Sequence, residues 1–355
     1  MSSPTSPRTV IRWGIIGCGD VTEVKSGPGL QKAHGSQLLA VMRRNGALAA
    51  DFARRHGVPR WYDDARALAN DPEVDAIYVA TPPNAHLDGV LAAAAARKPV
   101  YVEKPMARHT AECDAMIAAC AAADQKLYVA YYRRALPRFL KIKELLEGGA
   151  IGPLTGLHYR FSAPGHAGTG ATTHGGPVQP PWRENATVSG GGLFLDLGSH
   201  ALDLLDYFGG ALQQVSGHAA RLATPGDVED AVSLTFRTAN GAPGTAAWNF
   251  ASFVKEDQLE LSGPAGRLSC SVFGHEPLRL ETARGIEHFE FAPPPHIAQP
   301  LIQTIVDELL GRGTCPSTGE SARRTNVVMD RALEAYYGGR TDAFWARPQT
   351  WPGNR

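Results

Sequence analysis

The segment that decides the fold reads IRWGIIGCGDVT and spans residues 11–22. Its first half is mostly apolar, as expected for a strand covered on both faces of a parallel sheet. Its second half contains glycines that let the chain turn sharply and bring a helix N-terminus against a pyrophosphate. The third glycine of the GxGxxG pattern is replaced by Thr22, so an ordinary tight turn is the alternative. The residues expected at a dinucleotide are Gly17, Gly19, Asp20, Val21 and Thr22.

A regular alternation follows this segment as far as residue 130. Short runs rich in β-branched residues alternate there with longer alanine-rich stretches. This alternation is typical of βαβ units around a parallel sheet. One expected helix, at residues 110–123, places Cys113 and Cys120 on one face as small buried hydrophobes. We therefore predict a doubly wound Rossmann domain for NAD(P) over residues 9–130, with strands at 11–16, 37–42, 76–80, 100–102 and 127–130.

The pattern changes after residue 131, where a helix is expected at 137–147, ending at Gly148-Gly149. Runs typical of strands then alternate with Gly/Pro turns, which predicts an open, mainly antiparallel sheet. We expect an α+β domain over residues 131–345, with a long loop at 162–181 lying over the site. Its expected strands are 154–161, 232–236, 245–250, 259–262 and 267–272, and its last helices are 296–310 and 319–337.

The bulk composition favours a small-molecule partner. The chain has 355 residues, more than one hydrophobic core usually supports, and it balances 35 Lys and Arg against 35 Asp and Glu. No net charge attracts it to nucleic acid or to an anionic membrane. The first residues lack the apolar stretch of a signal peptide, and the five cysteines show no CxxC spacing. We therefore expect a cytoplasmic protein with no membrane segment.

The end of the second expected strand bears on the choice of cofactor. NAD-selective proteins usually carry an Asp or Glu about 20 residues after the glycines, to bind the adenosine ribose. This chain has Arg43 and Arg44 there instead, 24 and 25 residues beyond Gly19. Two guanidinium groups suit a 2′-phosphate, so NADP(H) is favoured and NAD(H) is the alternative. A solvated arginine pair on a loop is the other interpretation.

Two motifs follow expected strands at the edge of the sheet that holds ligands in open α/β folds. TPPNAH, residues 81–86, follows one strand and contains Thr81, Pro82, Asn84 and His86, while Glu103-Lys104-Pro105 follows the next. The Lys104 ammonium can donate to a substrate oxygen or stabilise a developing alkoxide. A lone lysine is usually solvent-facing, but the following proline at a strand terminus favours function.

A third motif, SGGGLFLDLGSHALD at residues 189–203, contains Asp196, His200 and Asp203. In one helix these side chains project from one face. Histidine is the natural proton shuttle between a hydroxyl and water, and a carboxylate can hold its ring. A capping and salt-bridge face is the alternative. We expect no metal, because no second His or Cys cluster completes a coordination shell.

Two aromatic and basic pairs are further candidates. Trp182-Arg183 can lie at the mouth of the cleft, with an indole for stacking and a guanidinium for an anionic group. In the run Tyr131-Tyr132-Arg133-Arg134, Tyr132 and Arg133 are expected to reach a polar substrate. Interdomain packing is the alternative for both.

In this order, the motifs resemble the glucose-fructose oxidoreductase, inositol dehydrogenase and rhizopine-catabolism (Gfo/Idh/MocA) family over residues 11–337. The resemblance implies a Rossmann domain followed by an α+β domain whose open sheet often forms the subunit interface, hence a homodimer or homotetramer. By position, Lys104, Asp196 and His200 match the family's catalytic residues. The implied cofactor contacts are Gly17, Gly19, Thr22, Thr81, Pro82, Asn84, His86, Glu103, Lys104, Trp182 and Arg183.

The resemblance implies reversible hydride transfer between a nicotinamide and a carbonyl or secondary hydroxyl group of a sugar or polyol. In that reaction His200 moves the hydroxyl proton, and Asp196 and Lys104 orient the substrate oxygen. Two alternatives stay open: a non-catalytic NADP(H)-sensing regulator, and a glycoside hydrolase that uses NAD for transient oxidation.

Overall fold

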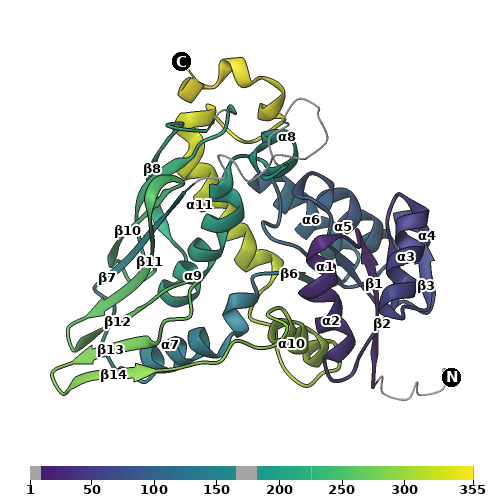
Figure 1. Ribbon diagram of the computed structural model, residues 1–355, viewed down its shortest axis with the longest axis horizontal. Coiled ribbons are helices and arrows are strands. Elements are labelled where there is room, and N and C mark those ends of the chain that lie inside the picture. The colour runs from purple at the N-terminus through teal and green to yellow at the C-terminus, as the bar shows by residue number, and fades with distance from the viewer. Residues whose placement is uncertain (1–8, 165–181, 225, 355) are drawn as a thin grey trace.

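The computed structural model describes residues 9–164, 182–224 and 226–354. Two β-sheets lie on opposite sides of a helical centre (Figure 1), one built by the first third of the chain and the other by its later part. Most of the loop predicted at residues 162–181 lies outside the described residues, and its first three residues continue a strand.

The first sheet is parallel, with the strand order β3-β2-β1-β4-β5-β6. The order reverses between β1 and β4, and open α/β sheets bind ligands outside the carboxyl ends of the strands at such a point. The predicted Rossmann fold is confirmed, although one edge strand was missed. The strands are β1 Ile11–Ile16, β2 Ser36–Met42, β3 Arg60–Tyr62, β4 Ala76–Val79, β5 Val100–Val102 and β6 Leu127–Val129.

Helices cover both faces of this sheet, which explains why its central strands are nearly all apolar, with Arg12 of β1 as an exception. Cys113 and Cys120 are free and buried in the helix predicted to hold them. The helices of this half are α1 Asp20–Val24, α2 Ser26–Lys32, α3 Gly46–His56, α4 Ala65–Ala69, α5 His86–Ala95 and α6 Thr110–Ala122.

The second sheet has the order β14-β13-β12-β11-β7-β10-β9-β8, and only its β7–β10 pair is parallel. An open, mainly antiparallel sheet was predicted and is confirmed. The mainly polar strand β8 and the strands β13 and β14 beyond residue 272 were missed. The strands are β7 Gly156–Pro164, β8 Gln213–Ala220, β9 Ala231–Arg237, β10 Pro243–Asn249, β11 Ala251–Gly263, β12 Gly266–Cys270, β13 Leu278–Thr282 and β14 Gly285–Phe289.

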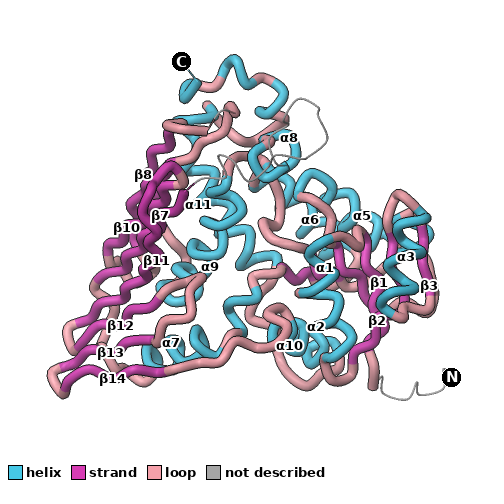
Figure 2. Tube along the Cα trace, viewed as in Figure 1, coloured by secondary structure: helices cyan, strands magenta, loops and turns pink. Residues whose placement is uncertain are grey.

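One face of the second sheet packs on helices, and burial alternates along β9 and β10 as expected for a sheet covered on one side (Figure 2). The buried face forms a core that includes Leu157, Trp248 and Leu333. In the described part of the chain, no helix is both long and apolar enough to cross a membrane. The helices of this half are α7 Pro137–Glu147, α8 Ala186–Ser189, α9 Ser199–Gly209 and α11 Gly319–Tyr337.

The helix α10, Gln299–Leu309, follows the second sheet in sequence but packs on the first (Figure 1). Its Leu301, Ile302 and Ile305 are fully buried and share a core with Ile11 and Trp13 of β1. This helix of the predicted 131–345 domain therefore lies on the sheet of the predicted 9–130 domain.

Candidate active site

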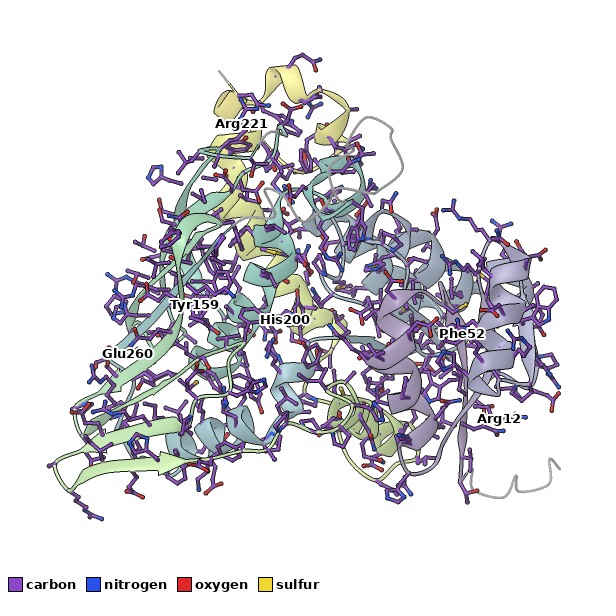
Figure 3. All side chains as sticks on the ribbon, viewed as in Figure 1. Arg12, Phe52, Tyr159, His200, Arg221 and Glu260 are labelled. Atoms are coloured by element: carbon purple, nitrogen blue, oxygen red, sulfur yellow. The ribbon has the colours of Figure 1, made fainter. Side chains whose placement is uncertain are left out.

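A cleft of about 1390 Å³ runs from the turn after β1 to the helix α9. His200 lines this cleft, and Figure 3 shows the residue between the two halves of the molecule. Segments far apart in sequence meet here because β1, β4 and β5 all end at the same edge of the first sheet. The predicted residues that line the cleft are Gly17, Gly19, Asp20, Val21, Arg43, Arg44, Thr81, Pro82, Asn84, Glu103, Lys104, Tyr132, Arg133, Trp182, Arg183, Asp196 and His200.

The two glycines of the turn serve different purposes. Gly17 has φ +92°, and a Cβ there would lie 2.9 Å from the backbone nitrogen of Thr81. A Cβ on Gly19 would meet nothing closer than the carbonyl oxygen of Gly17 at 3.9 Å, so this glycine leaves open space in the cleft. The turn therefore fits a dinucleotide that approaches the backbone closely.

We expect Gly19→Ala to fold normally but to bind the dinucleotide at least about 10-fold more weakly, because the added methyl group occupies ligand space. Gly17→Ala should instead lower the free energy of unfolding by about 1–3 kcal/mol, since alanine is strained at positive φ. Cofactor titration and urea unfolding of both variants distinguish the two effects. Unchanged cofactor affinity in Gly19→Ala would show that the space beside Gly19 is not used.

Two residues matched to cofactor contacts lie behind the wall of the cleft. Thr22 is fully buried, and its hydroxyl donates to the carbonyl oxygen of Gly19 at 2.7 Å. His86 is also fully buried, and its ring nitrogens lie 2.8 and 3.1 Å from the carbonyl oxygens of Thr81 and Met106. Both side chains hold the loops that line the cleft rather than lining it themselves.

The outer end of the cleft is basic. Arg43 and Arg44 are exposed there, and Arg66 of α4 joins them. None of the three forms a salt bridge with a residue that the structure describes. Arg66 was missed because it follows the short strand β3, which the sequence pattern did not reveal.

Lys104 and Asp196 meet at the inner end of the cleft. The Lys104 ammonium forms an ion pair with one oxygen of the Asp196 carboxylate and donates to the Asp196 carbonyl oxygen at 3.0 Å. Arg183 Nε lies 3.1 Å from the other carboxylate oxygen. Burial acts to raise the pKa of Asp196, but the positive charge of Lys104, followed by that of Arg183, outweighs it and lowers this pKa. Asp196 is therefore ionised and fixed.

The lysine is held by a second contact network at the end of β5. The Glu103 carboxylate accepts a hydrogen bond from the Tyr78 hydroxyl at 2.6 Å and another from the Lys104 backbone nitrogen at 3.1 Å. The Tyr78 hydroxyl also lies 3.0 Å from Ser26 Oγ. Glu103 thus fixes the backbone from which the Lys104 side chain extends.

His200 lies in the first turn of α9 and is 3% exposed. Its ring centroid is 5.2 Å from that of Tyr132 and 5.9 Å from that of Phe273. Burial, followed by the positive charge of Lys104, holds the pKa of His200 well below its usual value of 6.5. The imidazole is therefore neutral at pH 7 and available as a base.

The third member of the predicted array, Asp203, is not in the cleft, and that part of the prediction is wrong. Its carboxylate accepts two 2.8 Å hydrogen bonds from Arg134 in the protein interior. His200 and Asp203 lie in the same regular helix, α9, but three positions apart, and the buried Arg134 binds Asp203 on the interior side of that helix. Asp196 precedes this helix, in a π-helical turn at Phe194–Gly198. Among the described residues, no group of three or more His, Cys, Asp or Glu side chains is placed to hold a metal ion.

The triple glycine before Asp196 has a packing role that the sequence did not reveal. A Cβ on Gly192 would lie 2.2 Å from the carbonyl oxygen of Glu229. The buried Glu229 carboxylate also accepts hydrogen bonds from the Gly192 nitrogen at 3.0 Å and from the Tyr337 hydroxyl. This close approach fixes the start of the turn that carries Asp196.

Two further lining residues next to Asp196 and His200 were missed. Lys25 follows α1, and its charge acts on both Asp196 and His200. Phe273 follows β12 and presents its ring to His200. Neither belongs to a motif, and only the packing of the two halves brings them to the site.

Comparisons with known proteins identify the family of the chain. A family model described as an oxidoreductase family with an NAD-binding Rossmann fold matches residues 11–131, and the model of the GFO/IDH/MocA C-terminal domain matches residues 139–269. Oxidoreductase P35 of Formosa agariphila is 35% identical over 320 residues, which cover 90% of this chain and 97% of that protein.

More distant relatives have more specific names. Myo-inositol 2-dehydrogenase of Thermotoga maritima is 29% identical over 265 residues, covering 73% of this chain and 74% of that protein. A levoglucosan dehydrogenase solved with NADH and levoglucosan has a TM-score of 0.81 at 22% identity, covering 91% of this chain and 96% of that one. The family matches and the similarity to oxidoreductase P35 show that this chain belongs to the Gfo/Idh/MocA family of NAD(P)-dependent oxidoreductases acting on CH–OH groups.

Proposed function

We propose that the protein transfers hydride reversibly between NADP(H) and a secondary hydroxyl or carbonyl group of a sugar, polyol or related small molecule. The observation that carries this proposal is the meeting of Lys104, Asp196 and His200 at the inner end of a cleft whose other end holds the glycine turn and an arginine rim. The names of the relatives, which include inositol and levoglucosan dehydrogenases, support the substrate class.

Each of the three residues has a separate role in the proposed reaction. When bound, the nicotinamide cofactor supplies the hydride acceptor or donor. Neutral His200 accepts the hydroxyl proton during oxidation and returns it during reduction. The Lys104 ammonium donates to the substrate oxygen and stabilises negative charge that develops on it. Asp196 holds that ammonium in place from the opposite side of the cleft.

The preference for NADP(H) rests on the basic rim. Arg43 and Arg44 follow β2, where an adenosine ribose lies in Rossmann folds, and Arg66 adds a third guanidinium. Because none is paired with a described carboxylate, each is free to bind phosphate oxygens.

We expect the double variant Arg43→Ala/Arg44→Ala to bind NADP(H) about 10- to 100-fold more weakly, because charged hydrogen bonds to the phosphate are lost. Its affinity for NAD(H) should stay nearly constant. Fluorescence titration with both cofactors gives the ratio, and Arg54→Ala, whose side chain pairs with Asp51 on α3, is the control. If the ratio of the affinities for NADP(H) and NAD(H) is the same as in the unmodified protein, the arginines do not determine a preference for NADP(H).

The function itself is tested by a spectrophotometric screen. Sugars and polyols are offered with NADP⁺ and NAD⁺, and the corresponding keto compounds with NADPH and NADH. Net cofactor reduction or oxidation supports the proposal. Glycoside cleavage without net cofactor change indicates the hydrolase, and cofactor binding without any turnover indicates the regulator.

We also propose a homodimer or homotetramer formed through the open second sheet. The residues of β9 that alternate with its buried positions are exposed, and so leave the outer face available to a second copy. Light scattering during size-exclusion chromatography tests this, and a monomer would contradict it.

A further inference from the structure

The charges that line the cleft do not balance. Seven Lys and Arg side chains line it, the three of the arginine rim together with Lys25, Lys104, Arg133 and Arg183, against five carboxylates, those of Asp20, Asp64, Asp88, Glu103 and Asp196. Asp196 is shared between Lys104 and Arg183, and Glu103 accepts from Tyr78. Residues 165–181, outside the described part, contain no Asp or Glu that would restore the balance. An excess of positive charge therefore faces the substrate.

Arg133 is the most unusual of these cations because it is only 7% exposed. Its Nη1 donates to the carbonyl oxygen of Val272 at 2.7 Å, while its Nε is buried without a hydrogen-bond partner. The guanidinium carbon lies 4.4 Å from the centre of the Phe273 ring and 5.3 Å from that of Tyr132. Burying a charge without a counterion is costly, and unsatisfied buried donors are rare in native proteins.

Unlike Arg133, the two neighbouring buried arginines have no fully buried donor without a hydrogen-bond partner. Arg134 is paired with Asp203 and Asp206. Arg138 donates to the carbonyl oxygens of Ser271 and Gly274 at 3.1 and 2.8 Å. Neither of them lines the cleft, whereas Arg133 does. Of these three buried guanidinium groups, Arg133 is thus the one that lines the cleft and has a fully buried donor without a partner.

We propose, building on the hydride transfer above, that the substrate carries a carboxylate that binds Arg133, which makes it a sugar acid such as a uronic or aldonic acid. The Nε–Nη2 edge of this guanidinium has no partner among the described residues. Two parallel N–H groups on one edge match the two oxygens of a carboxylate. A phosphate dianion would leave further oxygens without donors on that edge.

The carboxylate and the reacting hydroxyl occupy neighbouring positions. The Tyr132 and Phe273 rings contact both the Arg133 guanidinium and the His200 ring. A sugar ring between them meets aromatic faces, while its carboxylate lies at Arg133 and its hydroxyl at His200. The substrate is thus fixed at two points, which orients the C–H bond that is broken.

The test compares matched substrates with the complete enzyme: glucuronate and galacturonate, the neutral glucose and galactose, and glucose 6-phosphate. We expect kcat/KM to be at least about 10-fold higher for an acid than for its neutral counterpart. Arg133→Met should lower the ratio of acid to neutral kcat/KM about 10- to 100-fold and leave the Kd of NADP⁺ nearly unchanged. Arg133→Lys should recover only part of this preference, because an ammonium lacks the planar edge.

Arg138→Met is the matched control, because Arg138 is another buried arginine that holds the same 271–274 segment. It should leave the ratio of acid to neutral kcat/KM unchanged. The proposal is overturned if neutral sugars or the phosphate are equally good substrates, or if Arg133→Met does not change the ratio. If no sugar is turned over, the proposed function fails, and calorimetric binding of glucuronate to the protein with NADP⁺, with and without Arg133→Met, still decides about the carboxylate site.

Discussion

Replacing His200 by glutamine should lower kcat for hydride transfer by about 10²- to 10⁴-fold, because the amide cannot take the hydroxyl proton. The imidazole, next to the rings of Tyr132 and Phe273, is the base in the proposed reaction. Cofactor affinity should be nearly unchanged, because the glycine turn and the arginine rim lie elsewhere. Steady-state kinetics together with cofactor titration check both statements.

The pH dependence gives a second check on the same residue. Burial and the charge of Lys104 hold the pKa of His200 well below 6.5, so the base loses its function only when the pH falls below that lowered pKa. The acidic limb of kcat/KM for oxidation should therefore lie below pH 6.5 and be absent in His200→Gln. A limb at or above pH 6.5, or near-normal turnover of the variant, would exclude His200 as the base.

The largest effect on stability is expected from Arg134→Met. This change leaves Asp203, which is 1% exposed, without its bidentate partner. Removing one partner of a buried ion pair costs about 3–5 kcal/mol. Urea unfolding should therefore show a decrease of that size in the free energy of unfolding. Arg324 pairs with Asp206 in the same network, but its side chain is 43% exposed.

Arg324→Met is therefore the matched control and should cost about 1 kcal/mol or less. Equal decreases in the free energy of unfolding of the two variants would mean that the buried Arg134–Asp203 pair contributes no more than the exposed Arg324.

The sequence was most informative where burial is complete. The central strands β1, β4 and β5 are covered on both faces, so they read as apolar runs and were predicted nearly to the residue. Strand β3 has three residues, none of them buried, and β14 is largely exposed, so neither shows a hydrophobic pattern. The docking of α10 on the first sheet was not predicted, because an amphipathic pattern shows that a helix face is buried but not against which partner.

The residues of the candidate site were also predicted only in part. Lys104 and His200 were found through motifs at the ends of elements, and the fold brings both to one cleft. Asp203 was misplaced because helical spacing does not show that the buried Arg134 binds this carboxylate in the interior. The unsatisfied guanidinium of Arg133 is visible only from its surroundings, since the neighbouring Arg134 has the same side chain and a complete set of partners.

The position of α10 sets a condition for exchanging substrate domains between relatives by recombination. A chimera joined once, near residue 130, would take Leu301, Ile302 and Ile305 from one parent and the sheet they cover from the other. Mismatched apolar side chains would then meet in the Rossmann core. Exchange therefore requires two more crossovers, one on each side of Gln299–Leu309, so that this helix stays with the sheet it covers.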